Sequence, residues 1–146
     1  MAPSWLSSQL AKVISKSKEY RFDWSGESKN EVYKIYLKGK DDEILGLMSL
    51  IDIPEEYRIH LNLVEVGLRN QGKAKEVDNI ARCLIAFACQ LAFDRDYFGF
   101  VSLKPKTRLI DLYQDKYGFR QYGSLLAVEQ QSSMVLINKY LRNEEE

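Results

Sequence analysis

The sequence has few of the residues that build metal sites and disulfide frameworks. It contains one histidine, His60, and two cysteines, Cys83 and Cys89. A conventional zinc site needs four ligands of these kinds, so we expect no metal cofactor. The cysteines lie six residues apart among apolar neighbours. This spacing fits neither a disulfide framework nor a metal motif, and we expect both side chains to pack as inert groups.

Net charge and long apolar runs are also lacking. The 21 basic and 21 acidic residues give a formal net charge of zero, which provides no global field that would favour nucleic acid or an anionic membrane. No apolar run approaches membrane-spanning length, and the N-terminal segment lacks the continuous apolar core of a signal peptide. We therefore expect a cytoplasmic protein. A chain of 146 residues with 45% hydrophobic content fits one domain, residues 1–146.

Alternation of apolar and polar residues predicts three strands in the first half of the chain. These strands are residues 31–38, 43–53 and 58–66. Because they follow one another closely, we expect an antiparallel meander. Residues 4–17 have apolar residues at helical spacing and predict an N-terminal helix, while residues 19–24 predict a short edge strand.

The second half of the chain alternates helices and strands. In chain order the predicted elements are a polar loop (69–76), a helix (78–94) that Asp78 could cap, a strand (97–104), a helix (105–117), a strand (119–129), a closing helix (132–142) with a serine cap, and a solvated acidic tail (143–146). The long helix predicts that strands 58–66 and 97–104 lie parallel, joined by a crossover. This order indicates an α/β or α+β domain of three layers.

Two segments could carry chemistry. The polar loop leads into a helix N-terminus, where free N–H groups and the helix dipole favour phosphate, although an ordinary solvated loop has the same composition. The helix 105–117 places Tyr113 and Tyr117 on one face and is followed by Gly118, which terminates helices well because it tolerates a left-handed conformation. From spacing alone, both tyrosines are interpreted as core side chains.

Taken in order, the strand, the phosphate-type loop, the long helix, the next strand and the helix ending in LYQDKYGF resemble the GNAT-type N-acetyltransferases. The resemblance covers about residues 31–129. It implies a central mixed, mostly antiparallel sheet with splayed parallel strands, flanked by helices, and acetyl-coenzyme A as co-substrate with an amine as acceptor. It also implies that Tyr113 is the general acid that protonates the departing thiolate of coenzyme A, whereas Tyr117 has a packing role.

The resemblance further implies contacts to the cofactor. Its pantetheine arm would pair with the backbone of residues 65–68, and its pyrophosphate would lie on the loop before the long helix. One register of that loop starts at Gln71 but lacks the following glycines. A later register, which we prefer, places Asn79 and Ala81 at the glycine positions, and asparagine tolerates glycine-like backbone angles well. The predicted cofactor-binding residues are Val66, Gly67, Leu68, Lys73, Lys75, Asp78, Asn79, Ile80, Ala81, Arg82 and Lys106.

Acetyl transfer requires an unprotonated amine, so a base or a water chain is expected. Glu65 is the only carboxylate near the crevice end of its strand and is the candidate base. Strand alternation places it on the face of Leu61 and Leu63 unless a bulge intervenes, and it could also simply pair with a basic side chain. His60 is a second candidate base, although a lone histidine on a strand is usually structural.

Two further functions remain open from the sequence. The missing loop glycines are compatible with a non-catalytic GNAT-like module that binds a cofactor or a regulatory partner. A local basic rim would suit an RNA- or tRNA-directed acetyltransferase, but it would serve the phosphates of coenzyme A equally well. The rim residues are Arg69, Lys73, Lys75, Lys104, Lys106 and Arg108. The acceptor and the oligomeric state have no signature in the sequence.

Overall fold

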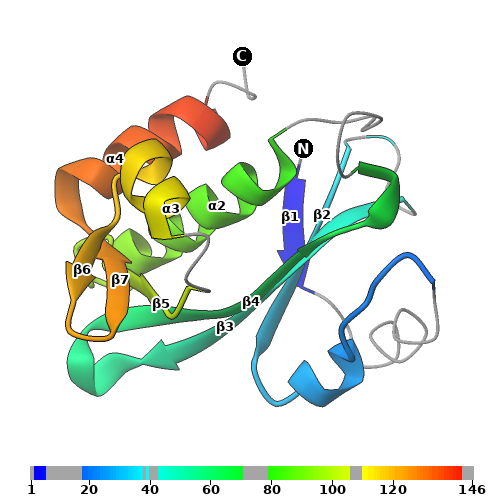
Figure 1. The fold of residues 1–146 in the computed structure, drawn as a ribbon, viewed down its shortest axis with the longest axis horizontal. Coiled ribbons are helices and arrows are strands. Elements are labelled where there is room, and N and C mark those ends of the chain that lie inside the picture. The colour runs from blue at the N-terminus through cyan, green and yellow to red at the C-terminus, as the bar shows by residue number, and fades with distance from the viewer. Residues whose placement is uncertain are drawn as a thin grey trace.

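The fold is taken from a computed structural model, which describes residues 2–5, 18–37, 39, 43–70, 79–105 and 110–142 (Figure 1). The strands are β1 (Ala2–Trp5), β2 (Glu31–Tyr36), β3 (Ile44–Ile53), β4 (Arg58–Val66), β5 (Val101–Leu103), β6 (Arg120–Tyr122) and β7 (Leu125–Val128). The helices are α2 (Ile80–Asp94), α3 (Ile110–Tyr117) and α4 (Gln130–Ile137), which continues as a π-helix (Asn138–Arg142). Short 3-10 turns are η1 (Trp24–Glu27), η2 (Pro54–Glu56) and η3 (Leu68–Asn70). Among the described helices, none has the length and apolar character needed to cross a membrane.

The strands form one mixed sheet in the order β1-β2-β3-β4-β5-β7-β6. The meander β2-β3-β4 is antiparallel, as its alternation predicts. Strands β4 and β5 are parallel and are connected through α2, which confirms the crossover prediction. The remaining pairs in the described sheet are antiparallel. The prediction of a mixed, mostly antiparallel sheet is therefore confirmed.

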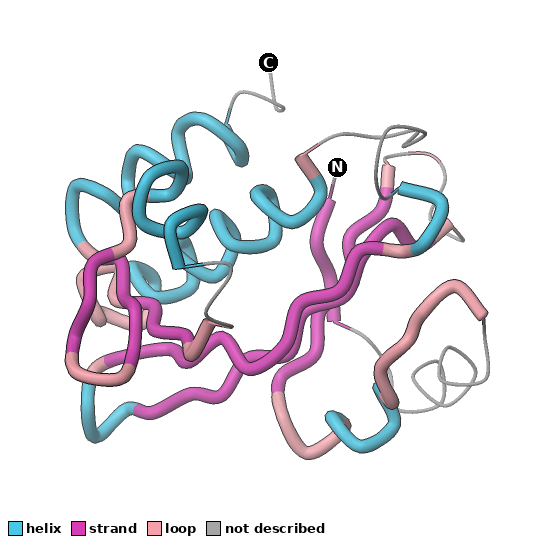
Figure 2. The backbone as a smooth tube through the Cα atoms, viewed as in Figure 1, coloured by secondary structure: helices cyan, strands magenta, loops and turns pink. Residues whose placement is uncertain are grey.

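Two hydrophobic clusters cover the two faces of the sheet. Helices α2, α3 and α4 lie together on one face (Figure 1), and the larger cluster is formed between them and the sheet. The segment from residue 18 to residue 30 crosses the opposite face (Figure 2), where Tyr20 and Trp24 pack on Val32 and Leu47. The sheet thus forms the middle of three layers, as predicted.

The beginning of α2 is fixed by a close approach to β3 at Gly46. A Cβ atom at this position would lie 2.7 Å from Ile80 Cγ2 and 3.3 Å from Leu84 Cδ1. Because Gly46 is also the register partner of Val66, the first residue of α2 packs beside the last residue of β4. This packing places the N-terminus of α2 at the carboxyl end of β4.

In the N-terminal region, the start of one predicted element differs from the structure and a second prediction is wrong. Residues 2–5, which include the start of the predicted helix 4–17, form strand β1 antiparallel to β2; residues 6–17 lie outside the described part. Residues 19–24 are not an edge strand, because the backbone N–H groups of Arg21 and Phe22 bind the side chain of Glu65 instead of a neighbouring strand.

Two predictions for the C-terminal region are corrected. The single strand expected over residues 119–129 is a hairpin, because Gly123 and Ser124 form a two-residue turn between β6 and β7, with Gly123 at φ 61°. The closing helix begins at Gln130 and not at a serine cap. Ser133 lies inside α4, where its hydroxyl donates to the Gly99 carbonyl at 2.6 Å.

Both cysteines are buried in the larger cluster, as expected for packing side chains. The Cys83 thiol donates to the Tyr140 carbonyl at a sulfur–oxygen distance of 3.1 Å. Burial raises the pKa of the Cys89 thiol to about 12, so this group stays protonated at physiological pH.

Candidate active site

Strands β4 and β5 separate partway along β4. They pair from Ile59–Val101 to Leu61–Leu103, where β5 ends. Strand β4 continues from Asn62 to Val66 along β3 alone. A gap between two parallel strands exposes backbone amide groups at one edge, and an extended ligand can pair with such an edge. This divergence is the splay that the sequence resemblance implies.

A β-bulge lies at the start of the splay. Leu61 is the register partner of Leu50, and Leu63 is the partner of the adjacent Ser49, so Asn62 is the extra residue on β4. The bulge changes the face to which the following side chains point. Leu61 belongs to the cluster under the helices, whereas Leu63 packs against the cluster on the opposite face.

The bulge also decides which backbone groups face the splay. The Gly67 amide donates to the Leu45 carbonyl of β3 at 3.0 Å. Since alternate residues of a strand direct their amide groups to opposite sides, those of Val64 and Val66 point toward the splay. Of the predicted backbone contacts, Val66 lies on this edge, while the Leu68 amide donates to the Glu19 carbonyl at 3.1 Å. Val64 was missed by sequence reasoning, because the bulge could not be seen.

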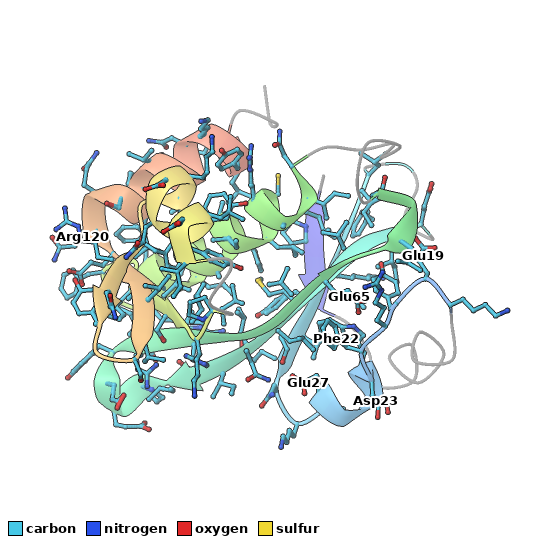
Figure 3. The ribbon with its side chains drawn as sticks, viewed as in Figure 1. Glu19, Phe22, Asp23, Glu27, Glu65 and Arg120 are labelled. Atoms are coloured by element: carbon cyan, nitrogen blue, oxygen red, sulfur yellow. The ribbon has the colours of Figure 1, made fainter. Side chains whose placement is uncertain are left out.

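Glu65, the predicted base, lies in an environment that differs from the one expected for a general base. Its side chain is buried on the face opposite α2 and points toward the segment of Phe22 (Figure 3). The carboxylate accepts from the Arg21 amide at 2.6 Å, from the Phe22 amide at 3.3 Å and from Trp24 Nε1 at 2.9 Å. A carboxylate with three donors is occupied as an anchor, so this geometry favours a structural role for Glu65 over proton transfer.

The N-terminus of α2 has the geometry expected for an anion site. Asn79 adopts a left-handed conformation, with φ 64° and ψ 20°, and its carbonyl accepts the first hydrogen bond of the helix, from Cys83. An asparagine thus provides the glycine-like conformation that the preferred register requires. The amide groups of Ile80, Ala81 and Arg82 form the first turn, where helix amides lack partners within the helix.

Arg82 brings a positive charge to this helix end. Its guanidinium carbon lies 5.8 Å from the ring centroid of Tyr117 and 5.7 Å from that of Tyr140. Its Nη1 donates to Asn79 Oδ1 at 3.2 Å. Because the rings belong to α3 and to the π-helix, Arg82 connects three helices beside the first turn of α2. The predicted ligands Lys73, Lys75, Asp78 and Lys106 lie outside the described residues.

Tyr113 lies on α3, half-buried against the larger cluster. Its ring meets those of Tyr117 and Phe119 edge to face, each with a centroid distance of 5.5 Å. Burial and then the neighbouring Tyr117 raise the pKa of Tyr113 above its ordinary value. The hydroxyl therefore stays protonated at neutral pH, as a proton donor must. Gly118 ends the helix with φ 75°, as predicted.

His60 takes part in a hydrogen-bonded group across β4 and β5. Ser102 Oγ lies 2.9 Å from His60 Nδ1 and accepts from Arg58 Nη1 at 2.5 Å. Arg58 Nη1 also lies 3.3 Å from His60 Nδ1. Burial and then the charge of Arg58 lower the pKa of His60, so the ring is neutral at physiological pH. Since Nδ1 faces two polar groups, this geometry favours a structural role for His60 at the strand junction.

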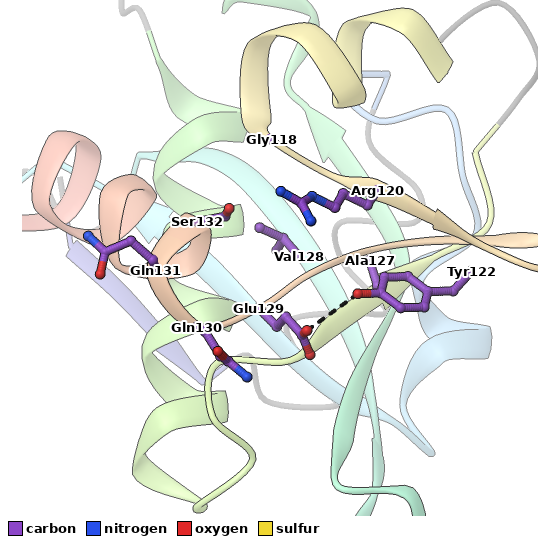
Figure 4. Close-up of a pocket in the computed structure, with 9 residues that line it drawn as sticks. All are labelled: Gly118, Arg120, Tyr122, Ala127, Val128, Glu129, Gln130, Gln131 and Ser132. Atoms are coloured by element: carbon purple, nitrogen blue, oxygen red, sulfur yellow. Dashed lines mark hydrogen bonds between the residues drawn. The ribbon is translucent and has the colours of Figure 1, made fainter.

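A cavity of about 180 Å³ lies apart from these residues, between the β6–β7 hairpin and the start of α4 (Figure 4). Arg120, Glu129 and Ser132 are among its lining residues, and the Tyr122 hydroxyl donates to Glu129 Oε1 at 3.3 Å across it. The cavity is lined by none of the predicted site residues. We therefore assign the candidate site to the splay and the N-terminus of α2.

Comparisons with known proteins show the fold. No protein-family model matches the chain, and no curated protein sequence matches it. Among solved structures, the IAA acetyltransferase from Bacillus cereus aligns with a TM-score of 0.58 at 13% identity, covering 84% of this chain and 78% of that protein. The PaiA N-acetyltransferase from Thermoplasma acidophilum, in complex with coenzyme A, aligns with a TM-score of 0.57 at 13% identity, covering 88% and 97%. Tetrahymena GCN5 aligns with a TM-score of 0.52 at 8% identity, covering 70% and 69%.

This chain has a GNAT-like fold. The resemblance noted in the sequence is thereby confirmed at the level of architecture. At such low sequence identity the alignments show only the fold. The roles of individual residues are argued from the geometry of this chain.

Proposed function

We propose that this protein is an acetyl-coenzyme A-dependent N-acetyltransferase. The observation that carries the proposal is the splay between β4 and β5, which opens beside the N-terminus of α2. A strand that has separated from its parallel neighbour and a helix N-terminus suit the two chemical parts of coenzyme A, its amide-containing arm and its pyrophosphate. The bound coenzyme A of the PaiA enzyme, which has the same fold, supports this choice of cofactor.

In the proposed complex, the pyrophosphate lies at the first turn of α2 with Arg82 beside it. The amides of residues 80–82 and the guanidinium supply donors and positive charge. From there the arm runs along β4 and pairs with the backbone of Val66 and Val64. The thioester then reaches the point where β4 and β5 meet, at Leu61 and Asn62.

The reaction transfers the acetyl group by direct attack. The acceptor nitrogen, as a free amine, forms a bond to the thioester carbon, and the carbon–sulfur bond breaks. Tyr113 donates its phenol proton to the departing thiolate and is reprotonated from solvent, while the new amide nitrogen releases one proton to solvent. The products are the acetylated amine and the thiol of coenzyme A. The raised pKa of Tyr113 supports its role as proton donor.

A thermal-shift series with acetyl-coenzyme A tests cofactor binding. A ligand that binds the native state at 100 times its Kd stabilises a protein by about 2.7 kcal/mol, so the Tm should rise by several degrees. Thiol release with a panel of amines then tests transfer. An unchanged Tm at millimolar acetyl-coenzyme A would contradict the proposal.

A GNAT-like module that binds coenzyme A without transferring acetyl groups is the second candidate. The observation that favours it is the occupied carboxylate of Glu65, which leaves the splay without the base that the sequence suggested. This candidate predicts a normal rise in Tm with acetyl-coenzyme A but no thiol release with any amine.

A further inference from the structure

A carboxylate that the sequence did not single out lies at the point where β4 and β5 separate. Asn62, the bulged residue of β4, donates from its side-chain amide to Glu27 Oε1 at 2.7 Å. Asn62 is exposed and Glu27 is half-buried, and the hydrogen bond between them lies at the surface. In the described part of the chain, no other hydrogen bond engages Glu27 Oε2 or Asn62 Oδ1. Two acceptor oxygens therefore lie together, open to solvent, at the narrow end of the splay.

The position of Glu27 is fixed by the segment that carries it. Glu27 ends the 3-10 turn η1, which begins at Trp24. The Trp24 side chain is fully buried and its Nε1 donates to Glu65. Figure 3 shows Glu65, Phe22 and Glu27 on the same side of the sheet. The buried Glu65 thus acts as a positioning residue that holds η1, and Glu27 with it, against the bulge.

We propose that Glu27 and Asn62 bind the acceptor amine as its ammonium ion. The inference rests on the proposed function, because that function places the thioester at Leu61 and Asn62. An ammonium group has three donors and no acceptor, so it matches Glu27 Oε2 and Asn62 Oδ1. The bound amine loses its proton to solvent before it attacks.

The surrounding charges define the class of acceptor. Asp23 is engaged within η1, where its Oδ1 accepts from the Ser25 amide and hydroxyl. Arg58, on the same face, is paired with Glu56 and Ser102. Among the described residues, Glu27 is the carboxylate hydrogen-bonded to the bulged residue, and its charge would repel a carboxylate attached next to the amine. The site selects amines without a neighbouring carboxylate, such as alkyl diamines, over amino acids.

A titration of the protein with 1,4-diaminobutane, without acetyl-coenzyme A, tests the site independently of turnover. The side-chain amide signals of Asn62 in ¹H–¹⁵N spectra should shift and saturate. In Glu27→Gln, which keeps a hydrogen-bond acceptor and removes the charge, the apparent Kd should rise about 10-fold. The control Glu55→Gln removes the same charge from an exposed residue of η2 and should bind like the unmodified chain. Glycine should not shift these signals.

Signals of Asn62 that do not respond to the diamine, or that respond equally in Glu27→Gln, would overturn the inference. Kinetics then separate it from the proposed function. If thiol is released, Glu27→Gln should raise the KM of the amine about 10-fold with little change in kcat, and the Kd of acetyl-coenzyme A should stay the same. If the diamine binds but no thiol is released, the acetyltransferase proposal fails while the amine site stands.

Discussion

Helix α2 is held by different interactions at its two ends. Just beyond its C-terminus, Arg95 binds Glu31 of β2 with nitrogen–oxygen distances of 2.6 and 2.9 Å. It also lies 3.7 Å from Asp52 of β3, whose carboxylate accepts from the Tyr97 hydroxyl at 2.8 Å. At its N-terminus, Arg82 lies over two aromatic rings and donates to the amide oxygen of Asn79.

Strands β4 and β5 are also arranged differently beside the two ends of α2. Near the C-terminus of α2, β4 and β5 are hydrogen-bonded to each other, and the ion pairs tie the helix to the sheet. Near the N-terminus the strands diverge. The carboxylates beside Arg95 fix the C-terminal end of α2 to the sheet, whereas the guanidinium of Arg82 lies over aromatic rings at the other end. The ion-paired end of α2 therefore stabilises the fold, and the other end lies at the proposed cofactor site.

Removal of the Tyr113 hydroxyl should have the largest effect of these variants. It should lower the rate of catalysis without disturbing the packing of the fold. General-acid assistance is worth about 10²–10⁴-fold, or roughly 3–5 kcal/mol of barrier. We expect Tyr113→Phe to lower kcat by about this factor, with the Kd of acetyl-coenzyme A unchanged, because the ring contacts with Tyr117 and Phe119 are retained. The matched control Tyr117→Phe keeps the face that Arg82 contacts and should keep its activity.

The pH dependence follows from the same hydroxyl. Because the folded-state pKa of Tyr113 lies above the ordinary value near 10, the donor form is present throughout the neutral range. Loss of kcat through ionisation of Tyr113 should begin only above about pH 10. An alkaline decline near pH 8 that disappears in Tyr113→Phe would contradict this assignment.

Loss of the ion pair at the C-terminal end of α2 should lower the stability of the fold without affecting cofactor binding. Arg95→Met removes the arginine partner of the half-buried Glu31, which keeps the Tyr33 hydroxyl as a donor, and hydrogen bonds to charged groups contribute about 1.5–3 kcal/mol. We expect the free energy of unfolding, measured by urea denaturation, to fall by about 2 kcal/mol. The Kd of acetyl-coenzyme A should not change. Arg120→Met, at an exposed position, is the control and should stay within about 0.5 kcal/mol of the unmodified chain.

The elements that depend on a local sequence pattern were predictable from the sequence. Strands β2, β3 and β4 follow from alternation, and the parallel pair follows from the long apolar helix between its strands. The left-handed conformation of Asn79 agrees with the loop register that the family resemblance implies, which places this asparagine at a glycine position. The sequence also predicts Tyr113 and Arg82 as site residues, and the Tyr113→Phe and Arg82→Gln variants test these roles.

What the sequence could not predict depends on contacts between distant segments. The extra residue Asn62 breaks no local pattern, so the face of Glu65 and the direction of Val64 were not predictable. Residues 19–24 have the composition of a strand, but their amides bind a carboxylate 43 and 44 positions away along the chain. Glu27 reaches the bulge only because that segment is anchored. The β6–β7 turn is different, since the glycine at position 123 was a usable local signal.

Arg82→Gln should weaken cofactor binding, with a smaller effect than the first two variants. Loss of one charge at the anion site is expected to raise the Kd of acetyl-coenzyme A about 10-fold, measured by calorimetry, and the increase should be larger at low salt. Lys29→Gln removes an exposed charge on the opposite side of the sheet and should leave the Kd unchanged. Equal Kd values for Arg82→Gln and the unmodified chain would place the pyrophosphate elsewhere.

The smallest effect should come from Glu31→Gln and should depend on pH. Burial alone would raise the pKa of Glu31, but the hydrogen bonds and charge of Arg95 outweigh it, so the pKa lies below its value of 4.5 in the unfolded chain. A carboxylate with a lowered pKa contributes stability above the unfolded pKa, and the contribution is lost as the pH falls through the folded pKa. At pH 7 the variant should therefore unfold with a free energy lower by about 1 kcal/mol, and the difference should shrink steadily as the pH is lowered below 4.5. The exposed control Glu55→Gln should show no such convergence. Since Arg95 stays charged at every pH used, a difference that persists in acid would mean that the contact between Glu31 and Arg95 stabilises the fold by packing and not by charge.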